Sequence, residues 1–220
     1  AAADGSDPVA CSRGDLLLSM AGPAVKPGTR FGYYARLSSR DKGIYRKSDA
    51  IAEVPLPDAA ALHPLVTVLG AMLEAGKRPS VGRAASALCN ALFEQLGVAP
   101  VRIRVREVRP SSERGELHGL YTFAHDGKPP EIEVWMRTAA HHRCVKFPTF
   151  LRTLVHEVAH HLDLSLHGLG NSFHTAGFFR RESSLSRQLL AAAPRAERPA
   201  RAPRPPRPPK PVQLSLFADL

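Results

Sequence analysis

The chain has 220 residues, of which 30 are Lys or Arg and 20 are Asp or Glu, giving a formal net charge of +10 at pH 7. This length accommodates one domain of moderate size plus tails, and the basic balance favours nucleic acid or another polyanion as a partner.

Three widely spaced cysteines, Cys11, Cys89 and Cys144, form no CxxC pair and indicate a reducing compartment. The apolar run 16–18 is too short for a signal-peptide core or a membrane span, so we expect a cytoplasmic protein without a membrane partner. Because the chain starts with Ala1 rather than Met, we expect its true start to lie upstream or to have been processed.

Residues 1–50 are predicted to form a loose basic leader. Residues 1–29 mix Ala, Gly, Asp, Ser and Pro without steady periodicity. Residues 30–47 interleave cations with aromatic residues, a mixture that can place cations on phosphates and rings on exposed bases. The alternative is a solvated segment that packs its tyrosines on the domain. The candidate DNA contacts are Arg30, Arg36, Arg40, Lys42, Arg46 and Lys47.

Residues 51–192 are predicted to form an α+β domain. Apolar residues keep helical spacing over residues 59–75, and a second helix is expected to be capped by Ser80 and ended by Gly97. Three strand-like runs follow, at residues 101–108, 117–123 and 131–136. We therefore expect helices and a small sheet of three or more strands beside the helix described next.

The most informative stretch is HEVAH at residues 156–160, which follows the HExxH pattern. His156 and His160 are four residues apart, so on a helix they lie on one face and both imidazoles reach the same ion. Glu157 lies about 100° further round and, in the usual arrangement, reaches the water at the open position of the metal. The pattern predicts a zinc hydrolase in which Glu157 transfers protons.

Apolar residues around this pattern repeat at three- and four-residue intervals, as in an amphipathic helix that buries one side. Pro148 marks its start and Gly168 its end. Asp163 continues the metal-facing stripe one turn beyond His160, so it is a candidate to orient a ligand or a neighbouring backbone group. The alternative for Asp163 is a solvated charge at a helix end.

A catalytic zinc site normally has three protein ligands, so a third must lie downstream. His167 misses the metzincin spacing by one residue and lacks the glycine of that motif. The breaker cluster at residues 168–171 can turn the chain back and bring His174 toward the helix. His174 is the preferred third ligand, and Glu182, close to the glutamate spacing of thermolysin-like enzymes, remains an alternative.

Three further residues have simpler interpretations. His118 and His125 flank a predicted strand and are expected on the surface. Tyr121 is expected to pack within its strand, the alternative being a hydrogen-bond donor to a developing oxyanion.

HEVAH, followed after thirteen residues by HTAGF at 174–178, resembles the SprT-like (Spartan) metalloproteases. Their pattern is HExxH, a short connection, and a third His with a Phe four residues later; Thr175 stands where the family more often has Gly. The resemblance covers about residues 80–192. It implies a minimal zincin fold, one Zn²⁺ bound by His156, His160 and His174, and protein substrates that are bound or crosslinked to DNA. In such folds the edge strand nearest the zinc takes the substrate backbone by strand addition, and we assign residues 131–136 to that edge, with an internal strand as the alternative.

Residues 193–212 form a Pro/Arg-rich tract that we expect to be a disordered, extended linker. Its eighteen-residue core gives a reach of about 55 Å. The five residues after it resemble the bacterial sliding-clamp-binding motif, in which the Gln is hydrogen-bonded and the Leu and Phe fill an apolar pocket. The alternative is a terminal amphipathic segment that folds back on the domain. The motif residues are Gln213, Leu214, Ser215, Leu216 and Phe217.

Together these features predict a zinc-dependent endopeptidase that degrades DNA-bound or DNA-crosslinked proteins and is recruited to replication or repair sites by the sliding clamp. The protein is then expected in the cytoplasm, associated with the nucleoid. One alternative is a regulatory peptidase that cleaves a specific repressor or partner. The other is a non-catalytic, zinc-stabilised adaptor for the clamp or DNA.

Overall fold

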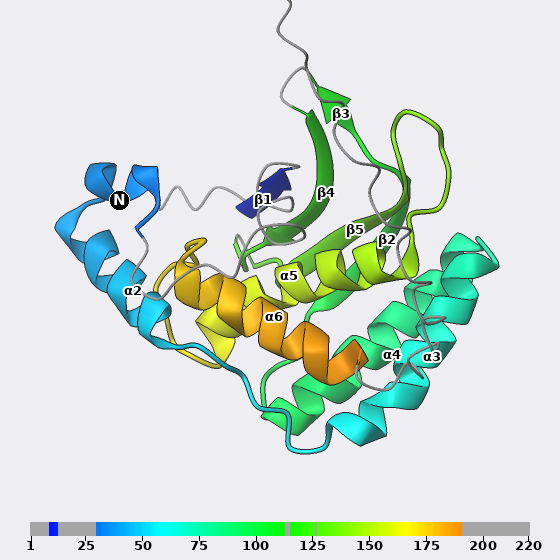
Figure 1. Cartoon of the computed structure of the whole chain (residues 1–220), viewed down its shortest axis with the longest axis horizontal. Helices are drawn as coiled ribbons and strands as arrows, with labels where there is room; N and C mark the ends of the chain where they lie inside the picture. Colours follow the sequence, from blue (N-terminus) through cyan, green and yellow to red (C-terminus); the bar gives the residue numbers. More distant parts are fainter. Residues whose placement is uncertain (1–8, 13–29, 113–114, 126, 191–220) are drawn as a thin grey trace, which may run out of the picture.

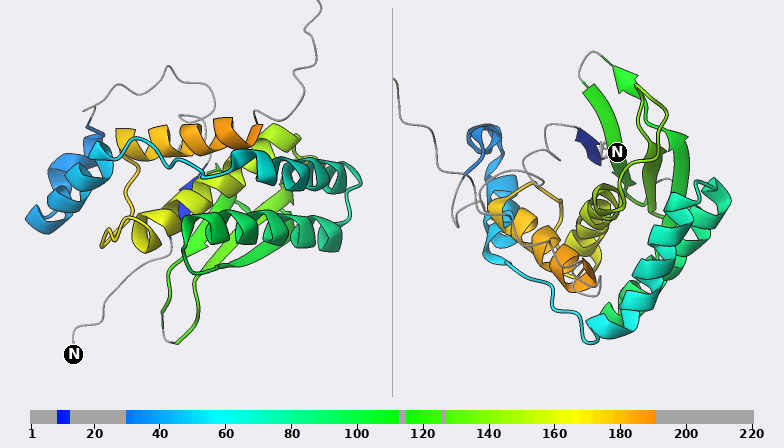
Figure 2. Two further views of the ribbon diagram at one scale, coloured as in Figure 1. Left: turned by 90° about the horizontal axis from the view of Figure 1, so that it is seen from below. Right: turned by 45° about the vertical axis from the view of Figure 1, so that its right-hand side comes forward.

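The computed structural model describes residues 9–12, 30–112, 115–125 and 127–190. These residues have an α+β architecture in which a curled mixed sheet is covered on one face by helices (Figure 1). The two views of Figure 2 place helix α5 (Phe147–Ser165) between the sheet and helix α6 (Ala176–Leu190). Helix α5 is therefore enclosed from two sides, which accounts for the continuous burial of its central turns.

The sheet has the strand order β1-β4-β5-β2, and the short strand β3 pairs with β4. Strand β5 pairs in parallel with β2 on one side and antiparallel with β4 on the other. The assignment of residues 131–136 to the sheet edge is therefore wrong, and the alternative of an internal strand holds. The strands are β1 (Val9–Ser12), β2 (Arg102–Val108), β3 (Ser111–Ser112), β4 (Gly115–Thr122) and β5 (Glu131–Arg137).

Helices α3 (Ala59–Glu74) and α4 (Arg78–Leu96) lie where helical spacing predicted them. They pack on each other, and α4 also packs on β2. Helix α4 begins at Arg78, with Pro79 in its first turn and no side-chain cap, so the prediction that Ser80 caps it is wrong. A proline in the first turn needs no hydrogen-bond acceptor for its nitrogen, which makes the earlier start favourable. Gly97 ends the helix at φ 64°, as predicted.

Residues 30–50 form ordered structure, so the prediction of a loose leader is wrong for this part of the chain. A short 3-10 helix, η1 (Gly32–Arg36), precedes α2 (Ser39–Ala50), which is capped by Ser38. Helix α2 packs on α6 so closely that a Cβ atom at Gly177 would overlap the backbone oxygen of Ser48. The ring of Tyr45 in α2 is only 1% exposed and packs against the rings of Tyr33, Tyr34 and Phe173.

The Pro/Arg tract at 193–212 and the motif at 213–217 lie outside the described residues, as do residues 1–8 and 13–29. Among the helices of the described part, none combines the length and apolar character needed to cross a bilayer.

Candidate metal centre

Three histidine side chains converge on one point between α5 and the segment that precedes α6. Their ligand atoms form a group able to hold a metal ion. The Nε2 atom of His174 lies 3.0 Å from Nε2 of His156 and 3.1 Å from Nε2 of His160. Two nitrogens bound tetrahedrally to zinc at 2.0–2.1 Å would be about 3.3 Å apart, so these separations are close to those of a zinc site.

The chain turns back after α5 to bring His174 to this point. Gly168 adopts a φ of 58°, a left-handed conformation that favours glycine. The backbone oxygen of His174 accepts a hydrogen bond from the Tyr33 hydroxyl at 2.9 Å, so η1 helps to hold the third histidine in place. The predicted role of residues 168–171 in returning the chain agrees with this path.

The other ring nitrogens of the two helix histidines have partners that fix their tautomers. Nδ1 of His156 lies 2.9 Å from Oε2 of Glu182, a carboxylate that can only accept when ionised. Nδ1 of His160 lies 2.7 Å from the Ser172 hydroxyl. Since that hydroxyl donates to Oδ2 of Asp163 at 2.8 Å, it accepts from His160. Both Nδ1 atoms therefore carry the proton, and both Nε2 lone pairs face the common point.

These contacts decide between the alternatives that the sequence left open for the third ligand and for Asp163. Glu182 contacts the outer nitrogen of His156, so in this geometry it orients a ligand and is not itself the third one. Asp163 is fully buried and reaches His160 through Ser172, which excludes a solvated charge. His167 is half-buried and is not a member of the three-histidine group. No pattern in the sequence identified Ser172 as a residue of this site.

Burial and neighbouring basic groups favour the neutral form of His160. Burial lowers the pKa of His160 well below its ordinary value, and the neighbouring His174, His156 and Arg181 lower it further. A neutral imidazole has a free lone pair for a metal ion, whereas an imidazolium has none. The local electrostatics thus favour the ligand form of His160.

Glu157 lies fully buried against strand β4 at Gly119. A Cβ atom at Gly119 would overlap Oε1 of Glu157 and come within 2.8 Å of its Cδ and Cγ atoms. Only glycine therefore lets the sheet approach the carboxylate this closely. Sequence reasoning missed Gly119, although a glycine inside a strand pattern is a known sign of close approach.

Three predictions, for residues in or near β4, can be compared directly with the structure. His118 is 8% exposed, so its assignment to the surface is wrong: it lies within β4, between β1 and β5, and not at the end of the strand. His125 is exposed, as predicted. Tyr121 packs in its strand, and its hydroxyl donates to Nδ1 of His161 at 3.1 Å, because Nε2 of His161 donates to the Ala99 oxygen. Burial raises the pKa of Tyr121 and lowers that of His161, so both stay neutral.

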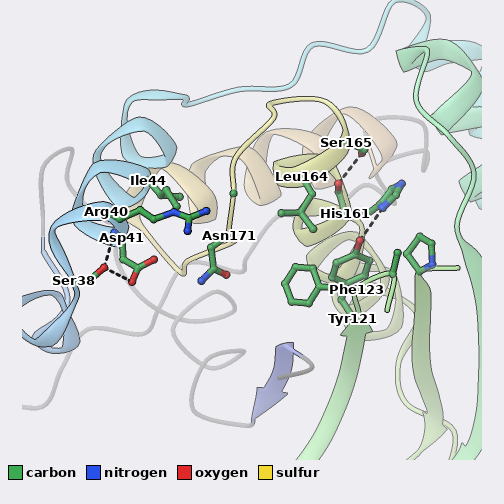
Figure 3. Close-up of a pocket in the computed structure, with 13 residues that line it drawn as sticks. Ser38, Arg40, Asp41, Ile44, Tyr121, Phe123, His161, Leu164, Ser165 and Asn171 are labelled. Atoms are coloured by element: carbon green, nitrogen blue, oxygen red, sulfur yellow. Dashed lines mark hydrogen bonds between the residues drawn. The ribbon is translucent and has the colours of Figure 1, made fainter. Parts of the chain in front are cut away.

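A cleft of about 960 Å³ lies beside the three-histidine group. One wall comes from α2 and the other from the end of β4 and the last turns of α5 (Figure 3). The ring of Tyr121, in the second wall, lies nearly parallel to that of His160, with their centroids 6.5 Å apart. Tyr121 therefore lies between the cleft and the three-histidine group. The residues labelled in Figure 3 are Ser38, Arg40, Asp41, Ile44, Tyr121, Phe123, His161, Leu164, Ser165 and Asn171.

Of the six candidate DNA contacts, Arg30 lies two residues before η1 and the other five lie on η1 or α2. Five of the six are exposed, and Lys42 is half-buried. The tyrosines that alternate with these cations in the sequence have contacts within the protein. The ring of Tyr34 lies 4.9 Å from the Arg30 guanidinium and 5.8 Å from the Lys42 ammonium. The rings are thus engaged within the protein, while the cations of Arg36, Arg40, Arg46 and Lys47 face solvent.

Comparisons of the chain with protein-family models, with curated proteins and with solved structures find no match. The interpretation of the site therefore depends on its own geometry and chemistry.

Replacing Gly119 with Ala is expected to destabilise the fold by about 1–3 kcal/mol, because the new methyl group must displace the buried Glu157 side chain. The free energy of unfolding in urea measures this change. Gly82→Ala in α4 is the matched control, since nothing lies within 4 Å of its Cβ position. That control should be neutral or stabilising, and equal losses for both variants would contradict the proposed contact.

The purified protein is expected to bind one equivalent of zinc, and His174→Ala should lower the affinity at least about tenfold by removing one of three ligands. Metal content after dialysis against a weak chelator provides the measurement. His125→Ala, an exposed histidine outside the cluster, serves as the control and should retain full occupancy. Equal zinc content in all three proteins would show that the histidine cluster does not bind the ion.

Proposed function

We propose that this protein is a zinc-dependent endopeptidase of the minimal zincin type, related to the SprT-like metalloproteases. The observation that carries the proposal is the convergence of three histidine Nε2 atoms with a buried glutamate directly after the first histidine. The α+β architecture, with a sheet beside the HExxH helix, supports the same class. His156, His160 and His174 would hold the ion, and their nitrogen donors fit zinc.

The residues of the chain have distinct roles in this chemistry. When bound, zinc supplies Lewis acidity, which polarises a carbonyl and makes water more acidic. Glu157 accepts a proton from the attacking water and returns it to the leaving amine of the peptide bond. Glu182 and the Ser172–Asp163 pair hold the two helix imidazoles in the orientation that exposes Nε2. The buried position of Glu157 against Gly119 limits the rotamers of its carboxylate.

We further propose that the substrates are proteins bound or crosslinked to DNA. Support comes from the net charge of +10, from the exposed cations of η1 and α2, and from the family resemblance. Arg40 belongs both to this basic surface and to the cleft beside the histidines, so DNA on α2 would lie next to a bound substrate (Figure 3). The QLSLF sequence at residues 213–217 supports recruitment by a sliding clamp and, with it, an association with the nucleoid.

Glu157→Gln is expected to lower kcat for cleavage of a DNA-binding protein at least about a hundredfold while leaving zinc content unchanged, because the amide cannot accept the proton. Cleavage of histone with and without DNA, followed by gel electrophoresis, provides the measurement. Broad cleavage stimulated by DNA supports the proposal. Selective cleavage without DNA stimulation favours a regulatory peptidase, and a zinc-loaded wild type that cleaves nothing would leave only an adaptor role.

Replacing both Leu216 and Phe217 with Ala should weaken binding to a bacterial sliding clamp at least about a hundredfold, because these side chains are expected to fill its apolar pocket. Surface plasmon resonance with the immobilised clamp measures the dissociation constant. Asp219→Ala, just beyond the motif, is the control and should bind as the wild type does. Unchanged binding of the double variant would exclude the motif as the docking element.

A further inference from the structure

Strand β4 has one edge bonded to β5 and its other edge bonded to the N-terminal segment Val9–Ser12. This segment, β1, lies beside β4 on the side away from β5 (Figure 1). Its pairing with β4 is antiparallel, with Val9 opposite Tyr121 and Cys11 opposite Gly119. Without β1, the edge of β4 over residues 117–121 would present free backbone donors and acceptors, the kind of surface to which an extended peptide adds as a new strand.

The outer edge of β4 lies close to the residues of the candidate metal centre. Gly119 is the residue that touches Glu157, and Tyr121 lies beside His160. A backbone added along β4 therefore passes both the proposed proton-transfer group and one of the proposed metal ligands. Beyond Tyr121, the neighbouring residues Phe123 and Ala124 form part of the cleft, so a longer extended chain on this edge would continue into it.

The family resemblance implies that a substrate backbone adds to the sheet edge nearest the metal ligands, and we propose that the chain's own Val9–Ser12 segment occupies this edge, the outer edge of β4, as an intramolecular competitor of extended polypeptide substrates. The proposal rests on the proposed peptidase function and specifies its substrate as a locally unfolded segment read mainly through backbone hydrogen bonds. Strand β1 is suited to exchange because it has four residues and a register irregularity between Cys11 and Ser12, and each backbone hydrogen bond contributes only about 1 kcal/mol net.

The double variant Ala10→Pro/Cys11→Pro in the full-length chain tests this assignment. Two successive prolines remove both backbone donors at the centre of β1, so whichever one faces β4 is lost. Gly5→Pro/Ser6→Pro introduces the same residues N-terminal to the described strand Val9–Ser12 and is the matched control. Amide hydrogen exchange of residues 117–121 should become at least about tenfold faster in the double variant and not in the control.

The second measurement is independent of catalysis. In a Glu157→Gln background, a fluorescent peptide covering residues 5–16 should bind the double variant at least about tenfold more tightly than the control, because the tethered competitor is gone. The same peptide with prolines at positions 10 and 11 should not bind. In the catalytically competent protein, kcat/KM for casein should rise at least about fivefold in the double variant, and the unlabelled peptide should reverse this rise.

The outcomes separate this inference from the proposed function. Unchanged exchange of residues 117–121 would show that β1 does not hold the edge, and faster exchange without tighter peptide binding would show that the edge does not receive peptides. Either result overturns the inference. If no variant cleaves casein, the peptidase proposal fails, while the exchange and binding measurements still decide whether β4 is a peptide-docking edge.

Discussion

A buried ion pair between Asp163 on α5 and Arg181 on α6 joins the elements that position the three-histidine group. Arg181 Nη2 lies 2.7 Å from Oδ1 of Asp163, and both side chains are at most 1% exposed. Burial raises the pKa of Asp163, and the guanidinium of Arg181 and the hydroxyl of Ser172 offset part of this rise. Losing one partner of such a pair leaves an uncompensated buried charge, a cost of about 3–5 kcal/mol.

Both members of this pair have further contacts that extend its influence. Arg181 also donates to the backbone oxygens of Ser48 and Ile51, so it fixes the end of α2 against α6. Asp163 accepts from Ser172, which in turn orients His160. One ion pair thereby couples the packing of the basic helix α2 to the direction of a histidine in the metal centre. The satisfied hydrogen bonds around the pair offset the cost of placing two charges in the interior.

Local patterns in the sequence were sufficient for helices α3, α4 and α5 and for the histidine group. The spacing of apolar residues predicted α3, α4 and α5, and the four-residue spacing of His156 and His160 placed them on one face. His174 could be predicted because glycines precede it and a zinc site needs a third ligand. These predictions succeeded because each depends on a few neighbouring residues or on simple coordination chemistry.

The features that the sequence did not reveal depend on long-range pairing. The alternating pattern of β5 is compatible with an edge or an internal strand, and only its parallel pairing with β2 decides between them. The inward packing of α2 depends on Gly177, more than a hundred residues away, and the burial of Arg181 contradicts the usual exposure of arginine. The close approach of Gly119 to Glu157 likewise requires the sheet to be placed against α5 first.

If β1 competes with substrates for the edge of β4 as proposed, its covalent connection to the rest of the chain would affect selectivity among those substrates. A competitor on the same chain acts at an effective concentration that can reach the millimolar range for a short connection, however dilute the protein is. A freely diffusing protein at micromolar concentration would seldom displace it. A target held close by a shared scaffold would compete on equal terms, so proximity rather than sequence would set the rate at which a given protein enters the site.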